Sequence, residues 1–338
     1  MILVTGGAGF IGSNLHAALV RRGLETVVAD RLRDRGKWRN LSGHPPARIV
    51  APEALEDFLA DHPPLEMVFH LGAISATTAC DGDLVWGVNV GLPQMLWRWC
   101  AARGVRLVYA SSAATYGDGS QGFDDRLGFA DGLGFADGLA GLERLRPLNL
   151  YGWSKHAFDL WVARAVARGE KPPPQWAGLK FFNVYGPNEG HKGAMISVVK
   201  VKLDEVAAGL VPRLFRSDRA DVADGEQRRD FIWVGDTVDV MLWLLDHPEV
   251  SGLFNLGTGA ARSYRAVAEA VCRASGVAPA VEFIDMPAAL RGRYQSFTEA
   301  PMQRLRAAGY NGQFTSLEEG VARYAALLRQ SGGGGRPG

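Results

Sequence analysis

The feature that most constrains the fold is a glycine-rich turn directly after the first apolar segment. Residues 1–5 read MILVT, a pattern typical of a buried strand, and residues 6–12 read GGAGFIG, with the spacing GxxGxxG. Residues 11–22 then follow a helical pattern. A strand, a glycine turn and a helix in this order bind a dinucleotide, because glycine lets the backbone approach a pyrophosphate and the helix N-terminus offers unpaired N–H groups. The sequence therefore predicts that a dinucleotide is bound by Gly6, Gly9, Phe10, Ile11 and Gly12.

The second apolar segment, residues 26–30, ends in Asp30, a position that sets the preference for one dinucleotide over another. A carboxylate at the end of the second strand favours the ribose 2′-hydroxyl of NAD. Cations that follow it favour the 2′-phosphate of NADP, and here they are Arg31, Arg33, Arg35 and Lys37. A solvated basic loop is the other interpretation of such a run. The residues leave both cofactors open, and four cations against one carboxylate favour NADP.

Apolar runs and helical patterns continue to alternate along the chain, which is typical of a parallel sheet built from βαβ units. Strands are predicted at 67–72, 105–112, 177–186 (followed by a turn), 230–234 and 254–259, with helices near 88–103, 236–247 and 264–275. We expect an α/β protein with a Rossmann-type, doubly wound parallel sheet over residues 1–176, joined by returning segments near 181–186 and 229–258. A smaller C-terminal α/β substrate domain is expected over 187–330, and a flexible tail, SGGGGRPG, over 331–338.

Two segments interrupt this alternation. Residues 127–139 read LGFADGLGFADGL, which repeats LGFADG but is too short for a solenoid. We interpret it as a surface loop expansion, with a lid as the alternative. Residues 169–175, GEKPPPQ, contain three prolines that end a helix and predict a seam between a cofactor-binding half and a substrate-binding half.

Composition and charge exclude several classes of protein. The chain has 338 residues, of which 47% are apolar and 22% charged, enough for a sizeable core. Its formal net charge is +1, so no nucleic-acid partner is expected. Cys80, Cys100 and Cys272 match no metal pattern. Because no signal peptide and no apolar run of about 18 residues is present, we expect a cytoplasmic protein without a membrane partner.

A tyrosine–lysine pair predicts the chemistry. Residues 151–155 read YGWSK, and Tyr151 and Lys155, at positions i and i+4, share one face of a helix. They follow ASSAATYG (110–117) at a predicted strand end, where ligands bind in open α/β sheets. The alternative interpretation is a buried tyrosine on a core-facing helix, which the combination with the glycine turn disfavours.

This set fits hydride transfer from an alcohol, because a base must take the hydroxyl proton as the hydride leaves. The ordinary pKa of tyrosine, about 10, is too high for that task unaided. The ammonium group of Lys155 and an oxidised nicotinamide would favour the phenolate. A hydroxyl from Ser111 or Ser112, of which we favour Ser112, would hold the substrate oxygen. The expected catalytic set is therefore Tyr151, Lys155 and Ser112.

With these motifs the chain resembles the extended short-chain dehydrogenase/reductase superfamily. The matching stretches are VTGGAGFIG (4–12), HLGA (70–73), the asparagine of VNVG (88–91), YASSAATYG (109–117), YGWSK (151–155), FFNVYGP (181–187), RRDFIWVGD (228–236) and FNLGTG (254–259). They cover most of the chain in the expected order. The resemblance implies an enzyme that acts on nucleotide-linked sugars. It also implies cofactor contacts from Leu71, Gly72, Ala73, Ser75, Asn89, Val184 and Lys192, besides Tyr151 and Lys155.

A narrower resemblance is carried by three further segments. EGHKGAM (189–195), GRYQSFTEA (292–300) and LRAAGYNG (305–312) are similar to the ADP-glyceromanno-heptose 6-epimerases. The resemblance implies an isomerase with bound NADP that inverts C6″ of an ADP-linked heptose on the route to the lipopolysaccharide inner core, and a homo-oligomer, a pentamer. Lys192 matches the family's second base, beside Tyr151. The other interpretation of Lys192 is a loop lysine that only contacts the sugar diphosphate.

The same resemblance implies a set of substrate contacts. Asn183 matches a contact to the sugar, Arg229 a contact to the diphosphate, and Tyr294 a further substrate contact. The remaining implied contacts are Ser112, Ala194, Phe215, Arg216, Ser217 and Asp218. Two departures stand out: Ala194 replaces a serine that is common in the family, and the acidic segment SDRADVADGEQ (217–227) lies near the expected diphosphate site.

Other activities of the same superfamily are the main alternatives. A 4-epimerase would not need a second base, because the whole hexose ring can flip. A 4,6-dehydratase normally needs an acidic pair just after the serine, and SSAATYG (111–117) has none. A plain dehydrogenase would exchange free cofactor during turnover, and a non-catalytic dinucleotide sensor can lack the tyrosine–lysine pair that is present here.

Overall fold

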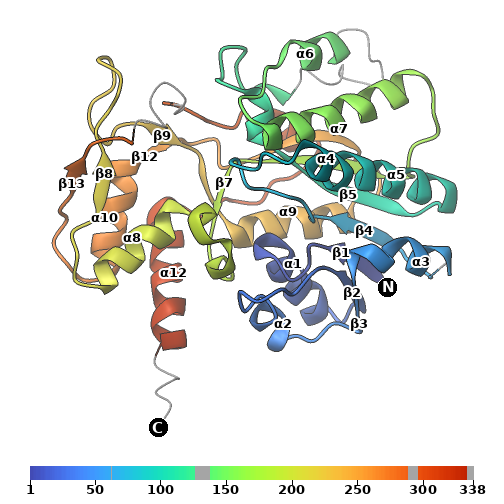
Figure 1. The fold of residues 1–338 in the computed structure, drawn as a ribbon, viewed down its shortest axis with the longest axis horizontal. Coiled ribbons are helices and arrows are strands. Elements are labelled where there is room, and N and C mark those ends of the chain that lie inside the picture. Colours follow the sequence, from blue (N-terminus) through green and yellow to red (C-terminus); the bar gives the residue numbers. More distant parts are fainter. Residues whose placement is uncertain (62, 126–137, 288–295, 333–338) are drawn as a thin grey trace. The chain divides into compact units, whose positions relative to one another are not determined.

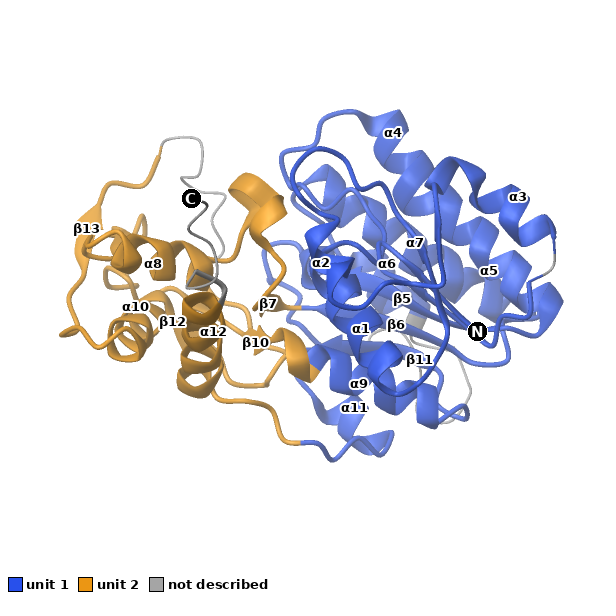
Figure 2. Cartoon of the chain, turned by 90° about the horizontal axis from the view of Figure 1, so that it is seen from below, with its two compact units in different colours: residues 1–181, 237–256, 301–312 blue, residues 182–236, 257–300, 313–338 orange. Residues whose placement is uncertain are grey.

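The chain folds into two compact units, each assembled from three stretches of sequence. The computed structural model describes residues 1–61, 63–125, 138–287 and 296–332. Unit 1 is made of residues 1–181, 237–256 and 301–312, and unit 2 of residues 182–236, 257–300 and 313–338 (Figure 2). The proline-rich segment 169–175, where the sequence predicts a seam, lies inside unit 1. Of the repeat at 127–139, only residues 138 and 139 belong to the described part of the chain. The domain boundaries expected from the sequence stay a prediction.

Unit 1 is built on a seven-stranded parallel sheet (Figure 1). Its strands lie in the order β11-β6-β5-β4-β1-β2-β3, and each neighbouring pair is parallel. Their bounds are β1 (Ile2–Thr5), β2 (Thr26–Ala29), β3 (Arg48–Val50), β4 (Met67–His70), β5 (Arg106–Ser112), β6 (Trp176–Phe181) and β11 (Gly252–Leu256). The strand order reverses between β1 and β4, the point at which open α/β sheets bind ligands outside the carboxyl ends of the strands. The predicted doubly wound α/β fold is thereby confirmed.

Helices cover both faces of this sheet, which explains why the strands read as continuous apolar runs. Every residue of β1, β2 and β4 is buried. Helices α4, α5 and α7 lie on one face and α1 and α9 on the other (Figure 1). The bounds are α1 (Phe10–Arg21), α2 (Arg39–Ser42), α3 (Leu55–Ala60), α4 (Gly82–Trp86), α5 (Leu92–Arg103), α6 (Gly138–Arg144), α7 (Leu150–Ala167), α9 (Val234–Asp246, which begins in unit 2) and α11 (Gln303–Ala307), with short turns η1 (Pro52–Ala54), η2 (Gly87–Gly91) and η3 (Ala113–Tyr116).

The single strand predicted at 177–186 is two strands in two different sheets, which corrects the sequence prediction. β6 ends at Phe181 in the large sheet, whereas β7 (Asn183–Tyr185) belongs to unit 2 and pairs in parallel with β10 (Phe231–Trp233). Phe181 and Phe182 are both buried, so the apolar run continues across the boundary. A hydrophobic pattern records burial and not the pairing partner, and it therefore does not reveal the change of sheet.

Unit 2 is the smaller unit and combines helices with two-stranded sheets. Besides β7 and β10, it contains the antiparallel pair β9 (Arg228–Arg229) and β12 (Arg262–Ser263), and the parallel pair β8 (Arg213–Phe215) and β13 (Glu282–Ile284). Its helices are α8 (Val198–Ala207), α10 (Tyr264–Ala274) and α12 (Leu317–Gly332), with the 3-10 segment η5 (Gly190–Met195). α12 extends to Gly332, so residues 331 and 332 of the expected tail are helical, and the rest of that tail lies outside the described residues. Within the described residues, no helix is long and apolar enough to cross a membrane.

Candidate active site

The glycine turn between β1 and α1 has the close backbone packing that a dinucleotide site requires. Gly6 has a φ of +68°, and a Cβ on it would lie 2.7 Å from the Cα of Gly72. A Cβ on Gly12 would lie 2.2 Å from the carbonyl oxygen of Gly6, so only glycine fits there without a backbone shift. The N-cap of α1 is Gly9, which places no side chain over the first turn. The positive end of α1 is therefore accessible to a phosphate, and these residues fit a bound dinucleotide.

Asp30 follows β2 directly and joins the glycine turn to the basic loop. Its Oδ2 accepts a hydrogen bond from the backbone N–H of Ala8 at 2.9 Å, and its Oδ1 lies 2.5 Å from the Nζ of Lys37. Arg31 forms an ion pair with Glu53. The acid and the lysine, which the sequence set against each other as signals for NAD and NADP, form one pair in the structure.

The start of α7 is packed tightly against the turn that follows β5. Asn149 caps the helix, and its side-chain oxygen accepts a hydrogen bond from the backbone N–H of Gly152 at 2.8 Å. A Cβ on Gly152 would lie 2.7 Å from the carbonyl oxygen of Ala114. The glycine within YGWSK therefore allows α7 to approach η3, and this approach places the next residues of the helix.

The three catalytic residues predicted for unit 1 lie together at the carboxyl end of β5. The hydroxyl of Tyr151 is hydrogen-bonded to the side chain of Ser112. The Nζ of Lys155 donates a hydrogen bond to the carbonyl oxygen of Ala110 at 2.8 Å. Ser112 and Lys155 are buried, with exposed fractions of 8% and 3%. The arrangement provides a hydroxyl pair and a nearby buried amine, which is the set that hydride transfer from an alcohol needs.

Burial shifts the pKa of both α7 groups in ways that matter for the chemistry. Burial raises the pKa of Tyr151, while the hydrogen bond with Ser112 lowers it and the negative charge of Asp159 raises it further. Burial lowers the pKa of Lys155 from 10.5 to about 8, against the attraction of Asp159. Tyr151 therefore keeps its proton until positive charge is added near it, as a bound oxidised nicotinamide would do.

The loop after β4 carries the predicted cofactor contacts Leu71, Gly72, Ala73 and Ser75. Asn89, buried in the π-helical turn η2, is bonded to both the backbone N–H and the carbonyl of Ile74 at 2.9 Å. Its amide also donates to the hydroxyl of Ser154 at 3.0 Å. Asn89 therefore holds the loop against α7, one residue before Lys155.

In unit 2, Lys192 lies in η5 with its side chain 24% exposed. Its backbone N–H donates to the carbonyl of Glu189 at 3.0 Å. The next residue, Gly193, has a φ of +57°, so the chain turns sharply just after the lysine. Burial lowers the pKa of Lys192, and the carboxylate of Glu189, 3.9 Å from its Nζ, acts in the opposite direction. A lowered pKa is the shift that a lysine base requires.

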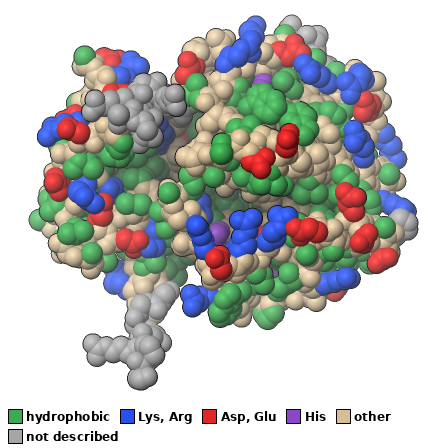
Figure 3. All heavy atoms as spheres, viewed as in Figure 1, with side chains coloured by type: hydrophobic (Ala, Val, Ile, Leu, Met, Phe, Trp, Pro, Cys, Tyr) green, Lys and Arg blue, Asp and Glu red, His purple; other side chains and the backbone are tan. Residues whose placement is uncertain are grey.

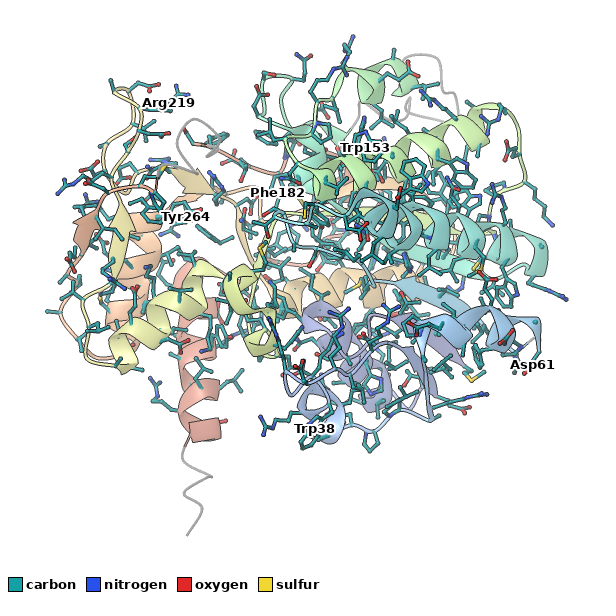
Figure 4. All side chains as sticks on the ribbon, viewed as in Figure 1. Trp38, Asp61, Trp153, Phe182, Arg219 and Tyr264 are labelled. Carbon is teal, nitrogen blue, oxygen red and sulfur yellow. The ribbon has the colours of Figure 1, made fainter. Side chains whose placement is uncertain are left out.

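Two acids near the expected diphosphate site, Asp221 and Asp224, are paired with arginines. Asp224 accepts a hydrogen bond from the backbone N–H of Ser217 at 2.8 Å and lies 3.2 Å from the guanidinium of Arg216. Asp221 lies 2.6 Å from Arg219, at the tip of the loop after β8 (Figure 4). The acidic departure from the family pattern therefore brings less negative charge than its sequence indicates.

Arg229 is buried in β9, with its Cζ 5.8 Å from the ring centre of Tyr264, at the start of α10 (Figure 4). Tyr294 lies outside the described residues. The other contacts implied for unit 2 are exposed or half-buried. The exposed ones are Asn183, Ala194, Arg216 and Asp218, and the half-buried ones are Val184, Phe215 and Ser217. Among the described residues, no group of His, Cys, Asp and Glu side chains is placed to hold a metal ion.

The sequence of the chain matches a known family over residues 2–257, that of the NAD dependent epimerases and dehydratases. The chain belongs to the NAD dependent epimerase/dehydratase family. A nicotinamide dinucleotide is thereby its cofactor class, in agreement with the glycine turn. The match ends just after β11, the last strand of the large sheet.

Individual members of this family are similar over nearly the whole chain. An ADP-L-glycero-D-manno-heptose-6-epimerase of Nitratidesulfovibrio vulgaris (strain DP4) is 48% identical, and one of Alkalilimnicola ehrlichii is 44% identical, each over 96% of both chains. The crystal structure of the Helicobacter pylori ADP-L-glycero-D-manno-heptose-6-epimerase is 26% identical, covers 97% of this chain and 96% of that chain, and has a TM-score of 0.75. The narrower resemblance carried by EGHKGAM is thereby confirmed.

A buried ion pair next to the epimerase-family motif is the main feature that the sequence did not reveal. Asp159 of α7 and Lys180 of β6 lie 2.7 Å apart, with side chains 0% and 1% exposed. Asp159 accepts a hydrogen bond from the hydroxyl of Ser111 at 2.6 Å, and Lys180 donates to that of Thr115 at 2.6 Å. The sequence carried one indication of this pair, the position of Asp159. It lies one helical turn after the tyrosine–lysine pair, at i+4 from Lys155.

Lys180→Met leaves Asp159 buried without its counter-ion, and we expect it to lower the free energy of unfolding by about 3–5 kcal/mol. The double variant Lys180→Met, Asp159→Leu removes both charges and is expected to recover most of that loss. Urea unfolding of the single and double variants measures the difference. Equal destabilisation by both would show that the pair is not the origin of the effect.

Proposed function

We propose that the protein is an isomerase that epimerises C6″ of an ADP-linked heptose, interconverting ADP-D-glycero-β-D-manno-heptose and ADP-L-glycero-β-D-manno-heptose. The observation that carries this proposal is a largely buried lysine, Lys192, whose side chain is 24% exposed, in addition to the set formed by Tyr151, Lys155 and Ser112. Relatives that bear this activity in their names, at 44% and 48% identity over 96% of the chain, support it. The product class is a heptose donor for the lipopolysaccharide inner core, as the resemblance implies. The cytoplasmic location stays a prediction.

Inversion at a carbinol carbon requires two groups that exchange protons with the same oxygen. The nicotinamide, when bound, supplies the hydride acceptor and donor. Because hydride exchange takes place on one fixed side, the end group of the sugar must turn between oxidation and reduction. The C6″ oxygen therefore meets the protein in two orientations, and we assign Tyr151 to one and Lys192 to the other.

The proton affinities of these two groups suit opposite tasks. Burial raises the pKa of Tyr151, so its hydroxyl begins protonated and is hydrogen-bonded to Ser112. Burial lowers the pKa of Lys192, which favours its neutral amine. In one direction Lys192 takes the proton of the C6″ hydroxyl and Tyr151 returns one, and in the other direction the roles are exchanged.

Incubation of the purified protein with ADP-D-glycero-β-D-manno-heptose, without added cofactor, is expected to interconvert the C6″ epimers with no net consumption of cofactor. Tyr151→Phe and Lys192→Met each remove one proton-transfer group, and we expect each to lower the rate by about 100-fold or more. Chromatographic separation of the two epimers measures both effects.

Lys200→Met is the matched control, because Lys200 is a lysine of the same unit that pairs with Asp204. We expect its rate to equal that of the wild type. If protein that holds cofactor leaves the heptose unchanged, the substrate assignment is wrong, and Ala194 becomes the first position to examine. Retained C6″ epimerisation in Lys192→Met would instead contradict the two-base assignment.

We propose NADP as the cofactor, with NAD as the alternative. The support is the contact between Lys37 and Asp30, because a neutralised carboxylate no longer repels a 2′-phosphate. Asp30 is 8% exposed at its side chain and Lys37 is 18% exposed, so solvent screens this pair only in part. The basic loop adds Arg31, Arg33 and Arg35.

Lys37→Ala removes a phosphate-binding cation and also exposes the charge of Asp30. We expect the variant to bind NADP about tenfold or more weakly and NAD with little change, measured by calorimetric titration of cofactor-free protein. Lys171→Ala, at an exposed lysine of the same unit, serves as the control. An equal loss of affinity for both cofactors would contradict a role for Lys37 in phosphate recognition.

We also propose that the protein is a homo-oligomer, with the pentamer as the size that the resemblance implies. Trp86 of α4 and Trp153 of α7 pack with ring centres 5.3 Å apart, and each is 45% exposed. Hydrophobic side chains gather on the surface over α4 and α7 (Figure 3), where Trp153 lies on the outer side of α7 (Figure 4). Exposed patches with large aromatic side chains mark contacts between proteins, and here the proposed partner is a second copy of the chain.

The variant Trp86→Glu, Trp153→Glu places charge in this patch and is expected to reduce the assembly to monomers or smaller oligomers. Light scattering after size-exclusion chromatography measures the mass in solution. Trp38→Glu, at a tryptophan that is 53% exposed elsewhere in unit 1, is expected to leave the mass unchanged. A wild-type protein of monomer mass would refute the assembly itself.

A further inference from the structure

Glu189 is a fully buried carboxylate three residues before Lys192. A buried charge of this kind persists where fixed partners compensate for lost water. Its Oε1 accepts hydrogen bonds from the hydroxyl of Ser197 at 2.6 Å and from the backbone N–H of Gly186 at 3.4 Å. Its Oε2 accepts one from the backbone N–H of Ser197 at 2.7 Å, and the hydroxyl of Tyr324 adds another to this carboxylate.

The distance between Glu189 and Lys192 is longer than that of a closed salt bridge. The Nζ of Lys192 lies 3.9 Å from Oε2, whereas charge-assisted N–H···O bonds measure about 2.7–2.9 Å. The same oxygen is already bonded to Ser197. The carboxylate is therefore held by its other donors, and it attracts the amine of Lys192 without closing on it.

We propose that Glu189 is a positioning residue for Lys192, whose rigidly held carboxylate orients the amine and keeps a proton on it available without trapping that proton. The inference rests on the proposed function, in which Lys192 exchanges a proton with the C6″ oxygen. Glu189 itself needs no contact with the substrate. It acts through the charge and the direction that it gives to the Nζ of Lys192.

Two opposing effects act on the pKa of Lys192, and both directions of the reaction require that neither effect dominates strongly. Burial favours the neutral amine, and the negative charge of Glu189 favours the ammonium, with burial the larger effect on the pKa of Lys192. Glu189 is a charged group that acts on this amine, and its effect is opposite to that of burial. A lysine that must give a proton in one direction and take it in the other works best when neither form is strongly favoured.

The elements around η5 add groups that act on the carboxylate. From α12, Tyr324 faces Glu189, and burial raises the pKa of Tyr324, with further increases from Glu189 and from Asp204 of α8. Tyr324 therefore remains a hydrogen-bond donor throughout the working range of pH. Asp204 is itself paired with Lys200 of the same helix, which limits its effect. His191 is the other titratable residue within η5.

The titration of Lys192 can be measured in the full chain without substrate. Competitive acetylation of amines with acetic anhydride at a series of pH values, followed by mass spectrometry of the peptide that contains Lys192, gives the midpoint for this side chain. In Glu189→Gln, which keeps the shape and removes the charge, we expect the midpoint to fall by about one pH unit or more. An unchanged midpoint would overturn the inference.

Glu205→Gln is the matched control. Lys202 and Glu205 form an ion pair of the same spacing elsewhere in unit 2, at 2.9 Å. Removal of that charge is expected to leave the Lys192 midpoint where it is in the wild type. A shift of equal size in this control would mean that the labelling reports the net charge of the unit and would overturn the assignment to Glu189.

A second variant tests the rigid support of the carboxylate with the opposite sign. Ser197→Ala removes one of the donors to the carboxylate, the hydroxyl on Oε1, so the carboxylate is held less tightly, can move closer to Lys192, and the midpoint is expected to rise. Ser197→Thr keeps the hydroxyl and is expected to match the wild type. A midpoint that falls in Ser197→Ala would show that Ser197 does not hold the carboxylate back. This pair of variants also serves if Glu189→Gln fails to fold.

Turnover gives an independent readout that separates this inference from the proposed function. With the heptose substrate, Glu189→Gln is expected to lower kcat about tenfold with KM nearly unchanged, and to move one limb of the pH–rate profile by the same amount as the labelling midpoint. A raised KM with unchanged kcat would contradict a role in proton transfer. If the wild type leaves the heptose unchanged while the labelling midpoint still moves as expected, the proposed function fails and the coupling of Glu189 to Lys192 stands.

Discussion

The ion pair between Asp159 and Lys180 is the interaction on which the catalytic end of unit 1 depends. It ties α7 to β6 at 2.7 Å in the absence of solvent. The cost of burying two charges is offset only where each finds further hydrogen bonds, and Asp159 accepts them from Tyr109 and Ser111 as well. Lys180 reaches Thr115, whose hydroxyl bonds the carbonyl of Ser112 at 2.8 Å. The Asp159–Lys180 ion pair, acting through Thr115, and the packing of α7 together fix the position of Ser112.

The Asp159–Lys180 pair of unit 1 and the Glu189–Lys192 pair of unit 2 have different roles. In unit 1 the Asp159–Lys180 pair is closed and buried, and it stabilises the position of the surrounding backbone. In unit 2 the carboxylate of Glu189 is equally buried, but Lys192 stands 3.9 Å away and is 24% exposed. The amine of Lys180 is engaged by Thr115 and Asp159, whereas that of Lys192 stands apart from its carboxylate and is partly exposed. The same two kinds of side chain therefore serve structure in one place and, by our proposal, proton transfer in the other.

The features that could be predicted from the sequence are those that a local spacing of residues determines. Gly6 and Gly12 were predictable because the backbone comes so close that no side chain fits, and Tyr151 with Lys155 because a helix fixes their common face. Charges on separate elements were harder. The sequence shows Asp30 and Lys37 as competing signals, and only their distance shows them to be partners.

Pairing between distant elements was the part that the pattern could not reveal. Lys180 sits in an apolar strand whose residues are all buried, and nothing in its neighbours names Asp159 as its counter-ion. The change of sheet between Phe181 and Phe182 is hidden for the same reason, since both residues are apolar and buried. Glu189 carried one signal, its spacing of i and i+3 to Lys192 on a single turn.

The interleaving of the two units has a consequence for how the chain is made. β6 pairs with β5 on one side and β11 on the other, and β11 follows the first stretch of unit 2, residues 182–236, in the sequence. While a ribosome synthesises residues 182–251, β6 is an open edge of a sheet whose residues are all apolar or destined for burial. A fragment that stops at residue 181 would keep that edge for good. The growing chain must therefore be protected from pairing with its neighbours until its last large-sheet strand emerges.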